Sequence, residues 1–199
     1  QGGITLSLDH PLALNDLFYI TLNHDMGGGM AGDRGTRGHT LHYSFPYANW
    51  LFSATYNAFH YHQNMPGAFK HNVYSGESEN SEIKLNRLLY RSRALKTTAA
   101  LRLWSRQARN FVDTHEQRGQ QRRMAGWEAS IHQRALMQTA TLDMTVAYRR
   151  GTGMLNTLAA PEETYLIPEG TARPEIITVD TAFSLPFKIK QQALQYSLN

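Results

Sequence analysis

The sequence predicts an all-β fold, an antiparallel up-and-down transmembrane β-barrel segment in which residues 1–199 are part of a single domain. Three observations lead to this prediction. Apolar and polar residues alternate with a period of two, short connections alternate with long ones, and the expected strands are long. Many of them span roughly 9–13 residues, which exceeds the soluble mode of about 5–6 and suits a tilted membrane strand of about 9–11.

Composition narrows the class of protein. The chain has 199 residues, of which 41% are hydrophobic, and it contains no cysteine. These values exclude a disordered chain, a disulfide scaffold and a zinc site built from cysteines. No run of about 18 apolar residues occurs, so a transmembrane helix is not expected. The net charge is +4, but the basic residues form no dense block, and we expect no nucleic-acid partner.

The strands follow from the alternation. Ile4, Leu6 and Leu8 alternate with polar residues near the start, and Met144 and Val146 do so farther along the chain. About ten strands are expected, with boundaries good to a few residues, at 3–9, 17–25, 37–45, 50–61, 72–87, 97–109, 121–133, 139–150, 174–186 and 191–199. The stretch 82–104 also fits a helix, because several leucines can share one helical face there.

The connections come in two kinds. Those at 10–16, 46–49, 134–138 and 187–190 are short, whereas those at 26–37, 62–72, 110–120 and 151–173 are longer. A meander that turns tightly at one end and loosely at the other gives this alternation. Outer-membrane barrels have it too, with short periplasmic turns and long external loops.

Each strand has one apolar and one polar face. We expect the apolar residues to share the convex, lipid-facing surface; among them are Ile20, Leu22, Leu142, Met144, Val146, Ile177, Val179 and Phe183. The polar face carries bulky charged residues, which suit a wet lumen. We expect it to line the pore with Arg102, Arg106, Glu128, Asp143, Arg149 and Asp180, and Glu128 and Asp143 to reach arginines on adjacent strands. A soluble β-sandwich, with this face in bulk water, remains an alternative.

Aromatic residues lie near many strand ends, as the interfacial girdles of membrane proteins require. The set is Phe18, Tyr43, Phe45, Tyr47, Trp50, Tyr90, Trp127, Tyr148, Phe187 and Tyr196. Sandwich cores also use aromatic residues, so this feature favours the membrane reading without excluding the other.

Motifs for catalysis or cofactor binding are weak. Gly27, Gly29 and Gly32 match G-x-G-x-x-G, but a strand pattern follows in place of a helix, so we expect only a glycine-rich loop. His60 and His62 share a strand face and can chelate a metal only with a third ligand, so a surface histidine pair is the favoured reading. Neither the glutamates at 77, 79 and 82 nor the arginines at 118, 122 and 123 complete a site. The arginines suit phosphate, and a loop end that faces lipopolysaccharide or solvent explains them equally well. We expect no cofactor and no enzymatic activity.

Six strings, in order along the chain, carry a resemblance to a known family. They are DHPLALNDLFY (9–19), GTRGHTLHYSFPY (35–47), YSGESEN (74–80), LNRLLYR (85–91), YRRGTG (148–153) and RPEIITVD (173–180). Each string is weak alone, but together they resemble the barrel of the two-partner secretion transporters, the TpsB or ShlB/FhaC-type haemolysin activator and secretion proteins. The transporters of contact-dependent inhibition toxins are similar.

The resemblance implies a bacterial outer-membrane barrel of about 16 strands, preceded by periplasmic POTRA domains. Such a barrel secretes one large TpsA-type exoprotein, a haemolysin, adhesin or toxin, without nucleotide hydrolysis, and it contacts outer-membrane lipid and lipopolysaccharide. Neither a POTRA pattern nor the family's V-R-G-F motif occurs in residues 1–199. We therefore expect this chain to be an internal segment of the barrel, and no family site residue is assigned. A diffusion porin or an autotransporter translocator is the alternative barrel class.

Overall fold

The computed structural model describes residues 2–25, 34–66, 71–159, 163, 171–189 and 192–198. It contains one antiparallel sheet, in which ten long strands follow one another in chain order and a two-residue strand pairs at the side of β6. The strands are β1 (Gly2–Asp9), β2 (Leu17–His24), β3 (Arg34–Tyr47), β4 (Trp50–Pro66), β5 (His71–Arg91), β6 (Leu95–Val112), β7 (His115–Glu116), β8 (Arg122–Leu136), β9 (Thr141–Thr152), β10 (Glu175–Ile189) and β11 (Gln192–Leu198). One 3₁₀ turn, η1 (Arg118–Gln120), precedes β8.

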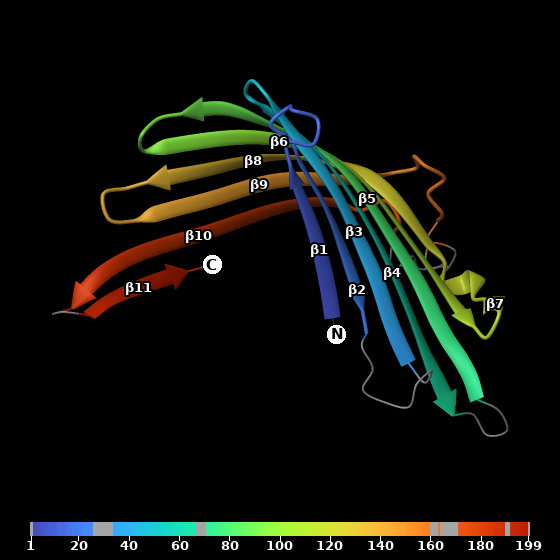
Figure 1. The fold of residues 1–199 in the computed structure, drawn as a ribbon. Helices are drawn as coiled ribbons and strands as arrows, with labels where there is room; N and C mark the ends of the chain where they lie inside the picture. The colour runs from blue at the N-terminus through green and yellow to red at the C-terminus, as the bar shows by residue number, and fades with distance from the viewer. Residues whose placement is uncertain are drawn as a thin grey trace.

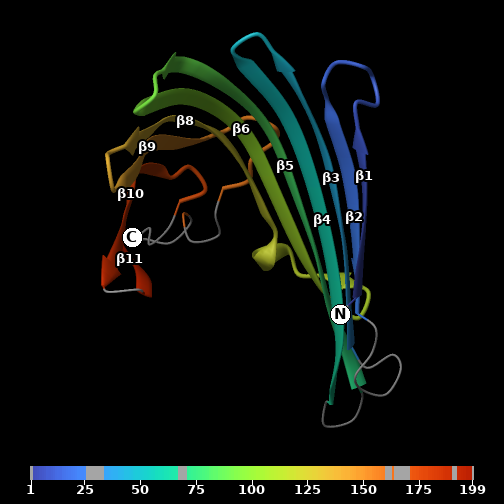
Figure 2. The same ribbon diagram turned by 60° about the vertical axis from the view of Figure 1, so that its left-hand side comes forward.

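The sheet is curved into an open trough. Figures 1 and 2 show the strands arching over from β1 at one edge to β11 at the other. The turns that join β1 to β2, β3 to β4, β5 to β6 and β8 to β9 follow one rim, here called the short-turn rim (Figure 1). β7 and η1 lie at the opposite end. The predicted curved antiparallel meander is confirmed for the described strands, but the connection lengths do not alternate throughout, since 67–70 between β4 and β5 is shorter than 10–16 between β1 and β2.

The structure corrects several sequence predictions. Residues 82–104 form parts of β5 and β6, so the helical alternative for this stretch is wrong. β4, β5 and β6 are 17, 21 and 18 residues long, longer than predicted. β4 and β5 take up most of the expected loop at 62–72, and β6 takes up the start of the one at 110–120. No helix in the described ranges has the length and apolarity to cross a membrane. The glycine-rich loop with Gly27, Gly29 and Gly32 lies outside the described residues.

Hydrogen-bonded partners on adjacent strands point to the same side of a sheet, so the register sorts the residues by face. The side called here the apolar face carries Leu6, Ile20 and Leu41 in one row across β1 to β3. All eight residues predicted for the lipid-facing surface fall on it: Ile20, Leu22, Leu142, Met144, Val146, Ile177, Val179 and Phe183. Ile177 is 71% exposed and Val179 60%, so this face is not covered by protein in the described structure.

The apolar residues form a band of limited height. On β4 it runs from Trp50 to Ala58, and on the same face His60 and His62 follow. On β9 it ends at Tyr148, which Arg150 follows. A band of about nine residues per strand matches the span of a tilted membrane strand. The longer strands therefore continue beyond the band at the end opposite the short-turn rim.

Aromatic side chains mark the edge of the band at the short-turn rim. Phe45 stacks on Phe52 with ring centroids 5.0 Å apart, and Tyr43 lies 6.0 Å from Phe45. The Arg87 guanidinium lies 4.8 Å above the Trp50 ring. Trp127 contacts Tyr148 toward the other edge. The side chains of Phe187 and Tyr196, two more predicted girdle residues, lie outside the described part of the chain.

Candidate functional site

The opposite side of the sheet, called here the polar face, carries the candidate site. Arg102, Glu128 and Arg149 are direct cross-strand partners on β6, β8 and β9. Arg106 lies on the same face of β6, Asp143 on the same face of β9, and Asp180 beside Thr145 on β10. The structure thus places all six predicted residues on one face, because each has the opposite strand parity from its apolar neighbours.

Glu128 is the centre of a charged ladder. Its Oε2 accepts hydrogen bonds from Arg102 Nη2 and from Arg149 Nε, each at 2.7 Å. Arg102 also donates from Nη1 to Glu82 Oε2 at 3.2 Å. The ladder therefore crosses four strands, β5, β6, β8 and β9. Only 15% of the Glu128 side chain is exposed, so the two arginines cover most of it.

The other predicted residues have partners of different kinds. The Asp143 carboxylate lies 3.7 Å from Arg134 Nε and 3.4 Å from His132 Nε2, both on β8. Arg106 Nε donates to the amide oxygen of Asn80 at 2.8 Å. The expected contacts of Glu128 and Asp143 with arginines on adjacent strands are present. Within the described residues, Asp180 has the hydroxyl-bearing Thr145 as its register partner.

Uncharged polar residues extend this face toward β1. Thr5 and Thr21 share a hydrogen bond at 3.0 Å, and Thr40 donates to Asn57 at 2.8 Å. His42 pairs with Thr55 at 2.8 Å. The paired residues of the polar face therefore change from hydroxyl, amide and imidazole groups on β1 to β4 to charged groups on β5 to β9.

A second charged cluster lies beyond the apolar band. His60 Nδ1 is 3.5 Å from one oxygen of Glu77, and Arg109 Nη2 donates to the other at 3.0 Å. His60 therefore contacts a carboxylate, while the register places His62 opposite Ser75. In the part of the chain that the structure describes, no three His, Cys, Asp or Glu residues are grouped as a metal site.

The remaining clusters suggested by the sequence are split by the strand geometry. Arg122 and Arg123 are neighbours in β8 and point to opposite faces, while Arg118 lies in η1. Glu77 and Glu79 share a face with each other but not with Glu82, which joins the Glu128 ladder. These residues do not form one phosphate site or one carboxylate pair.

Sequence reasoning missed Glu82 as a member of the ladder and did not single out Arg91, Lys96 and Arg134. These residues are brought together by the register between β5 and β6, which shifts at a bulge between Leu88 and Tyr90. Parity gives the face of a residue only as far as the next bulge, so the face of Arg91, as well as its partner, follows from the register and not from parity.

Comparisons with known proteins give the same architecture. The chain is 28% identical over 200 residues to the outer membrane transporter CdiB-2 of Burkholderia pseudomallei (strain 1026b), a match that covers 98% of this chain and 33% of that protein. CdiB from Acinetobacter baumannii superposes with a TM-score of 0.78 at 23% identity over 98% of this chain and 33% of its own. CdiB from Escherichia coli superposes with a TM-score of 0.84 at 17% identity over 94% and 34%. The chain spans about a third of the length of these relatives.

The profile of the haemolysin secretion/activation proteins ShlB/FhaC/HecB matches the sequence over residues 1–199. This match covers the whole ten-strand meander and both of its faces, and the predicted family resemblance is confirmed. The chain therefore belongs to the ShlB/FhaC/HecB family of haemolysin secretion/activation proteins.

Proposed function

We propose that this chain is part of an outer-membrane pore of two-partner secretion, which exports one large partner protein, a haemolysin, an adhesin or a contact-dependent toxin, without nucleotide hydrolysis. Family membership and the outer membrane transporter among its relatives support this assignment. The continuous antiparallel sheet supports it as well, because backbone N–H and C=O groups in lipid must find their hydrogen-bond partners on neighbouring strands.

The observation that carries the proposal is the division of the sheet into two faces. One face holds aliphatic residues that are more than half exposed, such as Ile4 and Ile83. The other holds the Glu128 ladder. A charge at the centre of a bilayer is costly, so the apolar face belongs against lipid and the polar face against water. In the proposed pore, the polar face lines the lumen.

A soluble β-sandwich explains these observations less well. It requires two facing sheets that cover each other's apolar side, whereas the described strands form one continuous sheet. A porin or an autotransporter translocator would share the two faces, but the family match favours secretion of a partner protein.

The test measures ion selectivity. The full-length protein is reconstituted in planar bilayers, and Asp143→Asn and Arg106→Gln are compared with the parent for conductance and reversal potential in a salt gradient. We expect the two changes to move the reversal potential in opposite directions, since one removes a negative and the other a positive charge from the lumen wall. Val146→Ile, on the apolar face of β9, serves as the matched control.

An unchanged reversal potential in both polar-face variants, with normal assembly, would show that this face does not line the pore. Export of the partner protein from cells is measured with the same variants. Loss of export after deletion of the transporter, restored by the parent gene, is the expected result. Export that persists without the transporter would contradict the secretion role.

A further inference from the structure

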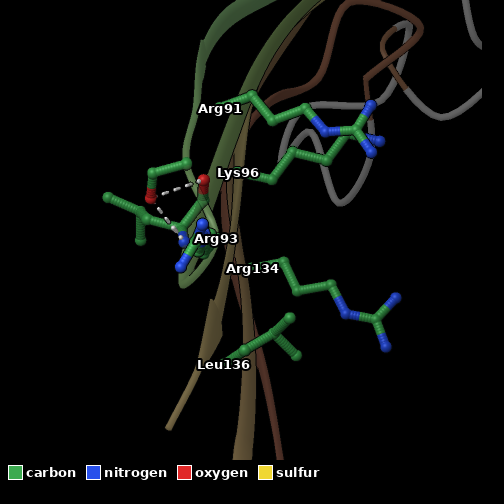
Figure 3. A pocket seen from close by; sticks show the side chains of 7 residues that line it. Arg91, Arg93, Lys96, Arg134 and Leu136 are labelled. Carbon is green, nitrogen blue, oxygen red and sulfur yellow. Dashed lines mark hydrogen bonds between the residues drawn. The ribbon is translucent and has the colours of Figure 1, made fainter.

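Basic side chains gather on the polar face at the short-turn rim. Arg91, at the end of β5, pairs with Lys96 on β6, and Lys96 pairs with Arg134 on β8. These three residues are called here the basic row. Together with Arg93, Leu95 and Leu136 they line a pocket at this rim. Figure 3 shows Arg91, Lys96 and Arg134 extending to the same side of the sheet, while Arg93 points elsewhere from the turn.

The backbone holds this row in place. The Ser92 N–H donates to the Leu95 carbonyl at 2.7 Å, and the Ser92 hydroxyl accepts from the Leu95 N–H at 3.0 Å. The turn between Arg91 and Lys96 is therefore a fixed hairpin. Its geometry keeps the backbone positions of Arg91 and Lys96 directly opposite each other.

The charges in the row are poorly balanced. Like charges directly opposite each other on a sheet destabilise it, and here three follow one another across β5, β6 and β8. Among the described residues, the carboxylate paired with this row is that of Asp143, 3.7 Å from Arg134, and His132 shares it. Arg87, the next basic residue of β5, is on the apolar face above Trp50. One carboxylate therefore faces three exposed cations.

We propose that the basic row captures acidic segments of the exported polypeptide as they enter the pore. This inference rests on the proposed function, in which the polar face lines the lumen and the short turns of an outer-membrane barrel face the periplasm. The row then lies at the mouth where the unfolded chain arrives. Carboxylate side chains of that chain balance its charge, and a positive mouth raises their local concentration and their rate of entry.

The register favours a polypeptide over a lipid headgroup as the anion. Lys96 and Arg134 lie on the side of the sheet opposite the apolar band. They are cross-strand partners on the same face as the pair Arg102 and Glu128. Lipid meets the apolar face, so phospholipid phosphates have access to Arg87 and not to this row.

The test uses block of single pores by poly-L-glutamate in planar bilayers containing the full-length protein. Addition from the short-turn side should block the ion current. The double variant Lys96→Glu/Arg134→Glu should weaken that block on the order of tenfold. The neutral double variant Arg91→Gln/Lys96→Gln should weaken it less, because it removes positive charge without adding negative charge. Poly-L-lysine should show the opposite order. Block by poly-L-glutamate should also weaken as salt rises, because screening shortens the reach of the row.

Arg118→Glu in η1 is the control, because it reverses the charge of a single basic residue at the opposite end of the sheet. A block that is equal in the parent and in both sets of variants would overturn the inference while leaving the pore intact. Unchanged block accompanied by weaker binding to phosphatidylglycerol vesicles would also overturn it, in favour of a lipid site. Absence of any ion conductance in the parent would instead refute the pore itself.

Discussion

Glu128 joins two cations that otherwise repel each other. Arg102 and Arg149 both donate to its Oε2, and the three side chains lie directly across β6, β8 and β9. A neutral amide in place of the carboxylate leaves two guanidinium groups beside each other with weaker acceptors. Hydrogen bonds to a charged group are worth roughly 1.5–3 kcal/mol each, so this residue contributes to the rigidity of the wall as well as to its charge.

We therefore expect Glu128→Gln to lower the free energy of unfolding of the assembled protein by roughly 1.5–3 kcal/mol. The measurement is urea-induced unfolding in lipid vesicles followed by tryptophan fluorescence. Arg106→Gln is the matched comparison, because Arg106 bonds only the neutral Asn80 in the described contacts. Equal destabilisation by the two variants would show that the ladder has no special role.

Asp16 fixes the turn between β1 and β2. Its carboxylate accepts from the Leu12 N–H at 3.2 Å, the Leu14 N–H at 3.1 Å and the Tyr43 hydroxyl at 3.0 Å. Burial alone would raise the pKa of Asp16, but the hydrogen bonds from Tyr43, Leu14 and Leu12 outweigh it, and the pKa lies below its ordinary value of 3.8. The ionised form therefore stabilises the folded turn.

Because the pKa is lowered in the folded state, this stabilisation is complete above the ordinary value of 3.8 and is lost as the pH falls through the folded-state value. We expect amide hydrogens of Leu12 and Leu14 to lose protection as the pH falls from about 5 to about 2. Asp16→Ala should reduce that protection at neutral pH and remove its dependence on acid. Hydrogen exchange with mass spectrometry measures both.

Tyr43→Phe separates the contributions to this turn. It removes the bond to the tyrosine hydroxyl and leaves the two backbone bonds, so its protection should lie between that of the parent and that of Asp16→Ala. Protection at Leu12 and Leu14 that is unchanged in Asp16→Ala would show that the turn does not depend on the carboxylate.

The pairing of β8 with its neighbours requires a glycine at one point. A Cβ on Gly126 would collide with the Arg150 carbonyl oxygen, and it would lie 2.8 Å from Cζ2 of Trp104. Trp104 is the register partner of Gly126 on β6, so its ring lies over the space that the missing side chain leaves. Glycine in a strand interior often marks such a close approach.

We expect Gly126→Ala to destabilise the protein by about 1–3 kcal/mol, the usual cost of overpacking. Urea unfolding in vesicles provides the measurement. Gly119 in η1 has open space around it, so Gly119→Ala should leave stability nearly unchanged. If both alanine variants unfold at the same urea concentration, the close approach at Gly126 is not required.

The strands also show what a sequence can and cannot predict. Within the apolar band, alternation predicted the face of every candidate residue, because a side chain's face depends only on its parity. Beyond Ala58 on β4 the pattern changes, because His60 and His62 follow on the face that carried the apolar residues, while Phe59 and Tyr61 lie on the other face. Hydrogen bonding continues there without an apolar pattern, and the lengths of β4, β5 and β6 were therefore underestimated. The partners of Arg102 required the register, which the bulge after Leu88 shifts.

At the scale of the whole molecule, the trough has one apolar and one polar surface. No side chain larger than alanine is buried among the apolar residues of the described structure, which has no packed interior of its own. A sheet of this kind exposes an apolar surface far larger than soluble monomers tolerate. In the proposed pore, its stability as a folded sheet therefore depends on the bilayer that covers the apolar face.

This dependence predicts opposite results for two neighbours on β9. Met144 is on the apolar face, where its partners are Gln133 and Thr181, and Thr145 is on the polar face between His132 and Asp180. Met144→Arg should cost about 2–4 kcal/mol if the site lies near the bilayer midplane. Thr145→Arg should cost far less, because the new cation meets water and the Asp180 carboxylate.

Folding into vesicles of defined thickness, measured as the urea midpoint of each variant, tests this pair in the full-length protein. A thicker bilayer places Met144 deeper in hydrocarbon, so the penalty of Met144→Arg should grow with lipid chain length while that of Thr145→Arg should not. Normal assembly of Met144→Arg, or a thickness-dependent penalty at Thr145 instead, would reverse the assignment of the two faces. The ladder around Glu128 would then have to face lipid, which the cost of charge at the midplane opposes.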